Sequence, residues 1–537
     1  MHKFLSADKK VPVIFIIMFS LFLWGSQYVL RDLWEPDEAR YTYVAKEMYE
    51  TNNWSIPQRN GEFYAHKPPL MFWLIHASAQ LTGGKFNGLS GRLPTLLGAI
   101  LSFWALSRLA AAWYDNKTAW RAFFILSTSS LFWQKGSMGQ IDMLLLGLTL
   151  SALHYLFESE KTDSHTGRIT AFSLMGCAIL AKGPVGLIVP CGIYVTANCL
   201  AGEKKKVLKK YWLWGIPLAL LWPALWLLLA YLDGAPKEYF DELLFKQNVG
   251  RFKGEFGGHV KPFYYYLKYL VIDFLPWTLF IPAATALLIN EKNLRKQSLK
   301  LTGWILFVII FFSISSSKRN LYIFSVYPAA SILLASVMPR MKDLPQKWIK
   351  GAVYPLLILF FLMALGGAAA LYFISLPASY TVFIPNLMIF FLGSVLLFLL
   401  FRRNGLTQKW FHLLIGIMII SELCVGSIVF PAFNKHKTPV ALAEAVKKNV
   451  PETNRLLLYK MNGEILALYS DRQGKRIDDI QDLLKEMDQS IRGVVVFSKG
   501  KWDGLKETLK NRGTTHSFQM GHKKMVWLEY VKKSANQ

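Results

Sequence analysis

The stretch WEPDEARYTYVAKEM, from Trp34 to Met48, is a polar segment enclosed by apolar sequence, and the rest of the chain is organised around it. A second polar stretch, NGEFYAHKPPL, follows from Asn60 to Leu70. The apolar run before them ends near Leu30, and the next convincing one starts near Leu93. The loop between these runs is too long for a simple turn and too rich in carboxylates, bases and tyrosines for a spacer. We therefore expect it to carry a function.

The first polar stretch predicts a short helix beside the membrane. Pro36 suits the first turn of a helix, because its missing N–H would be unpaired there anyway. Asp37 and Glu38 then lie at the positive N-terminal end of the helix dipole, and Tyr41 shares a face with Asp37. Such a helix can hold a carboxylate rigidly at the boundary of water and lipid. The alternative interpretation is an ordinary capped amphipathic helix.

The composition is typical of a polytopic membrane protein. Apolar residues other than glycine make up 53% of the 537 residues, above the usual soluble range, and the mean hydropathy is +0.28. The net charge of +26 argues for cytoplasmic loops rich in Lys and Arg rather than for nucleic-acid binding. The four cysteines all lie in apolar runs without metal-ligand spacing, so they imply no disulfide framework.

The apolar runs predict about 13 membrane spans. The first, Val11 to Leu30, lacks a signal-peptidase site and follows several lysines, so we interpret it as a transmembrane helix with a cytoplasmic N-terminus. The region from Ile169 to Pro190 is expected to form two short spans that share the hairpin AKGP. Bases cluster in alternate loops along the chain. The odd span count then places the C-terminal segment outside the cytoplasm. The later runs begin near Leu93, Ala119, Ile141, Ile169, Pro184, Trp212, Tyr264, Leu301, Leu321, Gly351, Thr381 and Phe411.

Two domains are expected. Residues 1–433 form the transmembrane domain, whose outer loop 31–92 carries the active site, and residues 434–537 form a small soluble α/β domain. In the latter, Val440 to Val446 and Ile480 to Met487 are helical in pattern, whereas LLLY (Leu456 to Tyr459) and VVVF (Val494 to Phe497) are strand-like. This domain is basic, which suits either an anionic membrane surface or an ordinary solvated exterior.

Charged and tyrosine side chains gather at the outer ends of the predicted spans, where charges are costly and call for a reason. The hairpin SSSKRNLYIFSVYP holds Lys318 and Arg319 on the side that the positive-inside rule disfavours. They either snorkel to lipid headgroups or bind a phosphate or pyrophosphate, for which Arg supplies a fork and Lys a point charge. The complete outer set is Asp37, Glu38, Arg40, Tyr41, Tyr64, His66, Lys67, Arg92, Asp142, Lys182, Asn248, Arg251, His259, Lys318, Arg319, Tyr322 and Tyr327.

Carboxylates beside a basic phosphate site at the outer face indicate group transfer from a lipid phosphate. Nucleotide sugars are not available outside the cytoplasm, so the donor must be a polyprenyl phosphate. One carboxylate then takes the proton of the acceptor, or orients it, as the acceptor attacks the anomeric carbon. Lys, Arg and Tyr stabilise the departing phosphate.

Seven blocks in order carry a specific resemblance: DEARYTYVAKEM, YAHKPPL, GRLPTLL, QIDMLLLG, AKGP, NVGRF…GH…PFYYYL and KRNLYIFSVYPA. Together they resemble the bacterial 4-amino-4-deoxy-L-arabinose lipid A transferases, which belong to the GT-C glycosyltransferases and have relatives among the protein O-mannosyltransferases. The resemblance covers about Pro12 to Ala330. It implies a 13-span enzyme of the inner membrane with a periplasmic C-terminal domain, an undecaprenyl-phosphate-sugar donor, a lipid A acceptor and an inverting single displacement.

The resemblance also implies roles for individual residues. It places the catalytic base at Asp37 and a second acidic position at Asp142. Glu38, which the sequence pattern places at the same helix end, is a further catalytic candidate. Contacts with the donor phosphate fall on Tyr64, Lys67 and either Tyr322 or Tyr327. The remaining substrate-binding candidates are Arg40, Tyr41, Arg92, Lys182, Arg251, Lys318 and Arg319. For Asp142, an ion pair with Lys135 or Arg92 at a helix end is the alternative, and for Lys182 a capping role in its hairpin.

One position departs from the family pattern. The family commonly has Glu-Lys-Pro-Pro where this chain has His66, Lys67, Pro68 and Pro69. In the family, that Glu and the His matching His259 meet at a metal ion. His66 and His259 are candidate zinc ligands here, although two ligands make a weak site, and no other cofactor is expected. The change lies near the donor phosphate and therefore bears on sugar specificity.

Two further functions stay open. A transferase of the same fold can move another sugar, such as mannose, galacturonate or an amino sugar, to another glycolipid, glycan or protein. A lipid or glycan transporter is the alternative from a different class. A transporter should place polar residues at mid-membrane and often shows repeated halves, whereas here they gather at the outer ends. The sequence favours the enzyme.

Overall fold

A computed structural model describes residues 9–250, 260–290, 295–373, 378–450, 455–520 and 523–531. The chain forms two compact units. Unit 1 consists of Met1–Gln27, Ala65–Met71 and Pro94–Val429. Unit 2 consists of Tyr28–Tyr64, Phe72–Leu93 and Phe430–Gln537. The domain boundary predicted at 433/434 lies close to Phe430, where unit 2 resumes. Unit 2 also contains most of the loop 31–92, which the sequence interpretation assigns to the transmembrane domain.

Among the described residues, eight helices are long and apolar enough to cross a membrane. A ninth candidate is the pair Phe263–Ile272 and Trp277–Ile289, which is bent by 98°. The predicted span at Val11 to Leu30 is α2, and the two helices predicted around AKGP are present. The count of 13 spans stays a prediction. The eight apolar helices are α2 (Val13–Leu30), α5 (Gly88–Trp113), α8 (Ile141–Thr162), α12 (Trp212–Leu232), α17 (Arg295–Ile314), α19 (Gln346–Phe373), α20 (Ile384–Asn404) and α21 (Gln408–Cys424).

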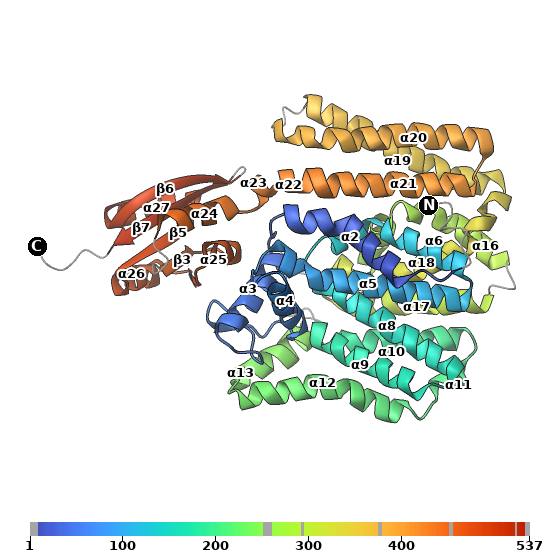
Figure 1. Ribbon diagram of the computed structural model, residues 1–537, viewed down its shortest axis with the longest axis horizontal. Helices are drawn as coiled ribbons and strands as arrows, with labels where there is room; N and C mark the ends of the chain where they lie inside the picture. The colour runs from blue at the N-terminus through green and yellow to red at the C-terminus, as the bar shows by residue number, and fades with distance from the viewer. Residues whose placement is uncertain are drawn as a thin grey trace, which may run out of the picture. The chain divides into compact units, whose positions relative to one another are not determined.

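Shorter helices complete unit 1, and most of its long helices run side by side with nearly aligned axes (Figure 1). A π-helix, η7 (Val425–Val429), continues α21. The shorter helices are α6 (Asn116–Ser127), α7 (Ser130–Gly136), α9 (His165–Lys182), α10 (Val185–Leu200), α11 (Lys204–Val207), α13 (Lys237–Phe240), η1 (Asp241–Gly250), η2 (Phe263–Tyr265), α15 (Tyr266–Ile272), η3 (Trp277–Phe280), α16 (Ile281–Asn290), η4 (Asn320–Ile323), α18 (Val326–Val337), η5 (Met338–Asp343) and η6 (Ala378–Phe383).

The helices α5 and α8 cross at two glycines. A Cβ atom added at Gly98 would lie 2.5 Å from the carbonyl oxygen of Met143, and one added at Gly147 would collide with the carbonyl oxygen of Gly98. Small residues allow the backbones of membrane helices to approach this closely. The crossing fixes the N-terminal end of α8, where Asp142 lies, beside α5.

We expect Gly98→Ala to destabilise the protein by about 1–3 kcal/mol, because the added methyl group has no space against the backbone of α8. Thermal unfolding of the purified protein in detergent measures the effect. Gly416→Ala is the matched control, since a Cβ atom there meets nothing within 4 Å although Gly416 also lies in an apolar helix. Equal melting temperatures for the two variants would contradict a tight crossing.

In unit 2, the C-terminal residues fold into an α/β domain around a five-stranded sheet of order β4-β3-β5-β7-β6. The strand β3 pairs in parallel with β4 and β5, and β7 pairs antiparallel with β5 and β6. The predicted strands LLLY and VVVF are confirmed as β3 and β5. The strands are β3 (Arg455–Tyr459), β4 (Gly474–Ile477), β5 (Arg492–Ser498), β6 (Gly513–Met520) and β7 (Lys523–Val531).

Helices cover both faces of this sheet, because β3 and β5 are apolar on both sides. One face packs against α24 and α25 through residues such as Leu442 and Leu466. The other packs against α26 and α27 through Leu483 and Trp502. The two predicted helices are confirmed as α24 and α26. The helices of this part are α22 (Phe430–Ala432), α23 (Asn434–Lys437), α24 (Val440–Asn449), α25 (Glu464–Ser470), α26 (Ile480–Gln489), α27 (Lys499–Leu509) and η8 (Lys510–Arg512).

The polar loop supplies the other elements of unit 2. The predicted helix is confirmed as α3 (Asp37–Glu50), with Pro36 at its N-cap. A hairpin of β1 (Gln58–Arg59) and β2 (Glu62–Phe63) follows, before α4 (Leu70–Leu81). Its turn residues Asn60 and Gly61 have φ angles of 57° and 77°, a backbone that Asn-Gly adopts readily in two-residue hairpins.

Candidate functional site

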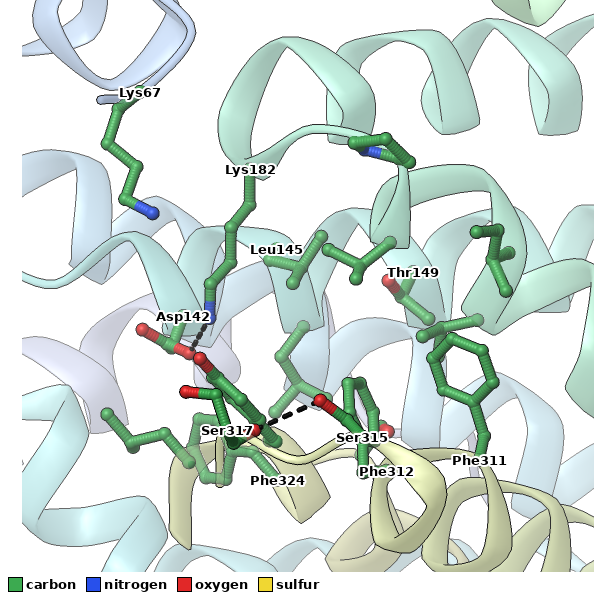
Figure 2. A pocket seen from close by; sticks show the side chains of 18 of the residues that line it. Lys67, Asp142, Leu145, Thr149, Lys182, Phe311, Phe312, Ser315, Ser317 and Phe324 are labelled. Carbon is green, nitrogen blue, oxygen red and sulfur yellow. Dashed lines mark hydrogen bonds and ion pairs between the residues drawn. The ribbon is translucent and has the colours of Figure 1, made fainter. Parts of the chain in front are cut away.

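A cavity of about 350 Å³ lies in unit 1 with polar side chains at one end and apolar ones at the other (Figure 2). The polar end includes Lys67, Asp142, Lys182 and Tyr322. All four are predicted site residues, and they come from four separate segments of the sequence. The apolar residues of the lining are Leu145, Leu146, Pro184, Val185, Ile188, Val189, Phe311, Phe312, Leu321 and Phe324. The cavity therefore suits a ligand with an anionic head and a long apolar tail.

Asp142 and Lys182 form an ion pair at the polar end of the cavity (Figure 2). Asp142 is the second residue of α8, and Lys182 is the last residue of α9, just before Gly183 turns the chain with a φ of 83°. The Lys182 ammonium also lies 5.3 Å from the ring centre of Tyr322. The alternatives with Lys135 or Arg92 as the partner of Asp142 are wrong, because Lys182 is its ion-pair partner.

Three positive charges act on the Asp142 carboxylate. They are those of its ion-pair partner Lys182 and of Arg319 and Lys67. Lys67 extends toward the same part of the cavity from its own segment (Figure 2). One carboxylate facing three cations leaves a surplus of positive charge at this end, and such a site attracts an anionic group.

Lys318 has a different environment from the one that the sequence suggested. Its side chain is buried, 3% exposed, and its ammonium donates hydrogen bonds to the carbonyl oxygens of Lys261, at 3.0 Å, and Ser315. A β-bridge between Val260 and Ser317 joins the same two segments. Burial lowers the pKa of Lys318. Lys318 therefore stabilises the hairpin and does not extend to lipid headgroups. It is not part of the phosphate site that we propose below.

Tyr327 lies apart from Tyr322, the other candidate for the same role. Its side chain lines a second, largely apolar cavity of about 1060 Å³. Its hydroxyl donates to Asp273 Oδ2 at 3.3 Å, and Asn320 Nδ2 donates to the same oxygen at 3.4 Å. Asp273, which is 6% exposed, was missed by the sequence analysis. A carboxylate within the apolar run LKYLVIDFLPW was the available signal.

In unit 2, Glu38 is the centre of a buried ion cluster. Arg31 Nη2 donates to its Oε1 at 2.7 Å, and Arg92 donates to its two oxygens from Nε and Nη2 at 3.0 Å each. The backbone N–H of Trp34 adds a bond of 2.9 Å. Burial alone would raise the pKa of Glu38, but the charges of Arg92 and Arg31 and these hydrogen bonds outweigh it and lower the pKa to about 2.

This cluster revises the predictions for Glu38 and Arg92. Arg92 is fully buried and also donates to the carbonyl oxygens of Arg31, at 2.7 Å, and Asp32, at 2.6 Å. Its guanidinium thus binds Glu38 and the backbone of the segment that precedes α3. We assign both residues to the folding of the loop, and neither to substrate contact.

Asp37, directly before Glu38, has a different ion-pair partner. Its carboxylate pairs with Arg40 one turn along α3, and 11% of its side chain is exposed. The Arg40 guanidinium lies 5.3 Å from the ring centre of Tyr41, and the rings of Tyr41 and Tyr64 each lie 6.0 Å from Phe72. Unit 2 therefore brings together the predicted residues Asp37, Arg40, Tyr41 and Tyr64.

The predicted metal site lies only partly within the described residues. His66 is exposed, and His259, its predicted partner, lies outside the part of the chain that the structure describes, as does Arg251. Within the described part, no three His, Cys, Asp or Glu residues gather in a way that could hold a metal ion. The zinc site stays a prediction from the sequence.

Comparisons with known proteins agree with this architecture. The chain matches the structure of ArnT from Cupriavidus metallidurans bound to undecaprenyl phosphate with a TM-score of 0.80, over 98% of this chain and 99% of that one. This chain has the ArnT-like GT-C fold. The apo form of that protein matches with a TM-score of 0.79. Sequence identity to both is 19%, so these matches establish the fold.

Sequence relatives extend the ArnT-like assignment. The undecaprenyl phosphate-alpha-4-amino-4-deoxy-L-arabinose arabinosyl transferase of Enterobacter sp. (strain 638) is 27% identical over 80% of this chain and 78% of its own length. Its namesake in Shewanella sediminis is 30% identical over 60% of this chain and 58% of its own length. The dolichyl-phosphate-mannose-protein mannosyltransferase family model matches residues 66–228. The predicted resemblance is confirmed, and the chain is a multi-pass membrane protein with an ArnT-like helical domain and a small C-terminal sheet domain.

Proposed function

We propose that this chain is a glycosyltransferase that moves 4-amino-4-deoxy-L-arabinose from undecaprenyl phosphate to lipid A. The observation that carries the proposal is the cavity of unit 1, whose cationic end and apolar end match the two parts of a polyprenyl phosphate. The names of the sequence relatives point to the same donor and sugar. A solved protein with this fold was crystallised with undecaprenyl phosphate.

The reaction that we propose is a single displacement with inversion at the anomeric carbon. An oxygen of the acceptor forms a bond to C1 of the sugar as the bond between C1 and the donor phosphate oxygen breaks. The electron pair of that bond stays with undecaprenyl phosphate, whose charge is stabilised by Lys67 and Lys182 with Arg319 and Tyr322 nearby. Asp37 takes the acceptor proton, or orients the acceptor where that oxygen is already ionised. Asp142 holds Lys182 in place.

We place this reaction at the periplasmic face of the bacterial inner membrane. The bases of the sequence cluster in alternate loops, a pattern that supports a cytoplasmic N-terminus and an outer position for the loop 31–92. The C-terminal α/β domain then lies in the periplasm, where lipid-linked sugars are the available donors.

Mass spectrometry of lipid A from cells with and without this protein tests the proposal. We expect a mass increment of one aminopentose that requires the protein. A mass increment of another sugar on lipid A would show that the donor carries that sugar instead. His66, the position that departs from the family pattern, would then be the first residue to test for sugar specificity. An increment on another glycolipid or on protein would replace the acceptor. No increment on any of these would overturn the transferase and favour a transporter.

Lys67 provides a prediction for the donor site. We expect Lys67→Met to weaken the binding of undecaprenyl phosphate by about 10–100-fold, because a charge-assisted hydrogen bond to phosphate is lost. Binding to the purified protein in detergent measures the effect. Lys318→Met is the matched control, since its ammonium is bound by two carbonyl oxygens. It should lower the melting temperature and leave donor binding within about twofold. Equal loss of binding in folded samples of both would contradict the assignment.

A further inference from the structure

The helix α3, which carries Asp37, is part of the core of the C-terminal α/β domain (residues 434–537). Tyr43, from the middle of α3, is 3% exposed and packs in the hydrophobic cluster that covers one face of the five-stranded sheet. Leu33, four residues before Asp37, is fully buried in the same cluster. The cluster contains Val494 and Trp527 from the sheet. Segments more than 400 residues apart in sequence therefore share one core.

C-terminal to Asp37, ion pairs also join α3 and the hairpin β1–β2 to the C-terminal domain. The Lys46 ammonium, in α3, lies 3.0 Å from Asp471 Oδ1 at the end of α25, and Lys447 of α24 pairs with the other oxygen of Asp471. Arg59, in the strand β1, pairs with Glu464 at the start of α25. Glu464 is buried, so this pair is shielded from water and from salt.

Glu47, the next residue of α3, joins the hairpin to the helix. Its two carboxylate oxygens accept the backbone N–H groups of Asn60, at 2.7 Å, and Gly61, at 2.5 Å. Gln473 of the C-terminal domain donates to the same carboxylate at 3.3 Å. The helix, the hairpin and the domain thus meet at one side chain.

The segment N-terminal to Asp37 is also hydrogen-bonded to the C-terminal domain. Asn434 accepts from the backbone N–H of Asp32 at 3.2 Å and donates to the carbonyl oxygen of Leu30 at 3.1 Å. The hydroxyl of Thr438 donates to Asp32 Oδ2 at 2.9 Å. The C-terminal domain therefore contacts both the segment before Asp37 and the helix α3 that begins at Asp37.

We propose that the C-terminal domain is the scaffold that orients α3 for sugar transfer, with Arg59, Glu464 and Asp471 as positioning residues for Asp37. The proposal rests on the proposed function, in which Asp37 acts on the acceptor. Loosening these contacts should slow the chemical step, because a displacement of about 1 Å in a reacting group can cost 10²-fold in rate. It should leave donor binding unchanged, since the donor cavity is lined by unit 1.

A double-mutant cycle on Arg59 and Glu464 tests this in the full-length protein. We expect Arg59→Met and Glu464→Gln each to lower kcat about tenfold while the KM for the donor stays within about twofold. The double variant should be no slower than either single one, because both remove the same contact. Lys475→Met and Glu486→Gln form the matched control: this ion pair joins β4 to α26, 2.6 Å apart, within the same domain. Its loss should not change kcat.

Asp471→Asn supplies a second variant that keeps the backbone. Asp471 has a φ of 53°, which Asn adopts well, so the substitution removes only the charge shared by Lys46 and Lys447. Hydrogen exchange of the amides of Asp37–Glu50 should become about tenfold faster in this variant than in the wild type. This readout does not depend on activity.

The outcomes separate the scaffold from the proposed function. Unchanged kcat in the Arg59 and Glu464 variants, with an inactive Asp37→Asn, would overturn the scaffold and leave Asp37 in place. Failure of the wild type to transfer any sugar would overturn the proposed function, and exchange in α3 would still decide whether the domain holds the helix. Additive losses of kcat, or losses equal to those of the Lys475 control, would show a general effect on folding and count against the proposal.

Discussion

Asp37→Asn is expected to reduce sugar transfer by about 10²–10⁴-fold, the range that a general base contributes. Asn keeps the size of the side chain and a hydrogen-bond acceptor for Arg40, so the N-terminus of α3 should remain intact. The substitution removes only the charge and the basicity. Initial rates with a lipid-linked sugar and purified lipid A in detergent measure the loss, beside the lipid A of cells that express the variant.

The comparison variants make this result specific. Asp488→Asn removes a carboxylate that pairs with Arg512 on the exposed surface of the C-terminal domain, and it should transfer at the wild-type rate. Asp142→Asn should mainly raise the KM for the donor, because Asp142 holds Lys182. If Asp37→Asn kept the full rate at normal protein levels, the base would be another group.

The parts of the fold that the sequence predicts are those set by local pattern. An apolar run such as Val13–Leu30 has few alternatives to a membrane helix, and LLLY and VVVF suit strands that are covered on both faces. Asp142 and Lys182 stand out because charges at span ends are costly. Their mutual pairing was not predicted, since they lie 40 residues apart and the sequence offered Lys135 and Arg92 as equal partners.

Asp37 and Glu38 cannot be told apart from the sequence, but they have different partners in the structure. The two carboxylates are neighbours at one helix N-terminus, and the local pattern treats them alike. Arg92 comes from 54 residues further along the chain and binds Glu38 together with Arg31, whereas Asp37 pairs with Arg40 of its own helix. In the same way, Lys318 and Arg319 form one motif in the sequence, and the hydrogen bonds of Lys318 to the carbonyl oxygens of Lys261 and Ser315 give it a separate, structural role.

Glu38→Gln is expected to reduce the free energy of unfolding by about 3–5 kcal/mol, the usual cost of removing one partner of a buried ion pair. The neutral amide would remove the carboxylate that pairs with the guanidinium groups of Arg31 and Arg92, both of which are buried. Thermal unfolding in detergent and the yield of folded protein measure the loss. Glu507→Gln is the matched control, because its pair with Lys510 is exposed and worth about 0–1 kcal/mol.

The pH dependence of this difference tests its electrostatic origin. The pKa of Glu38 is lowered from 4.5 in the unfolded chain to about 2 in the folded protein. A lowered pKa stabilises the folded state fully above the unfolded value, and the contribution is lost as the pH falls from about 4.5 through 2. The gap between wild type and Glu38→Gln should therefore be constant from pH 5 to pH 7 and shrink below pH 4.5. A gap that stayed constant to pH 3 would point to lost packing. A shrinking gap would show that the charge of Glu38 itself holds the two arginines, and with them the chain that leads to Asp37.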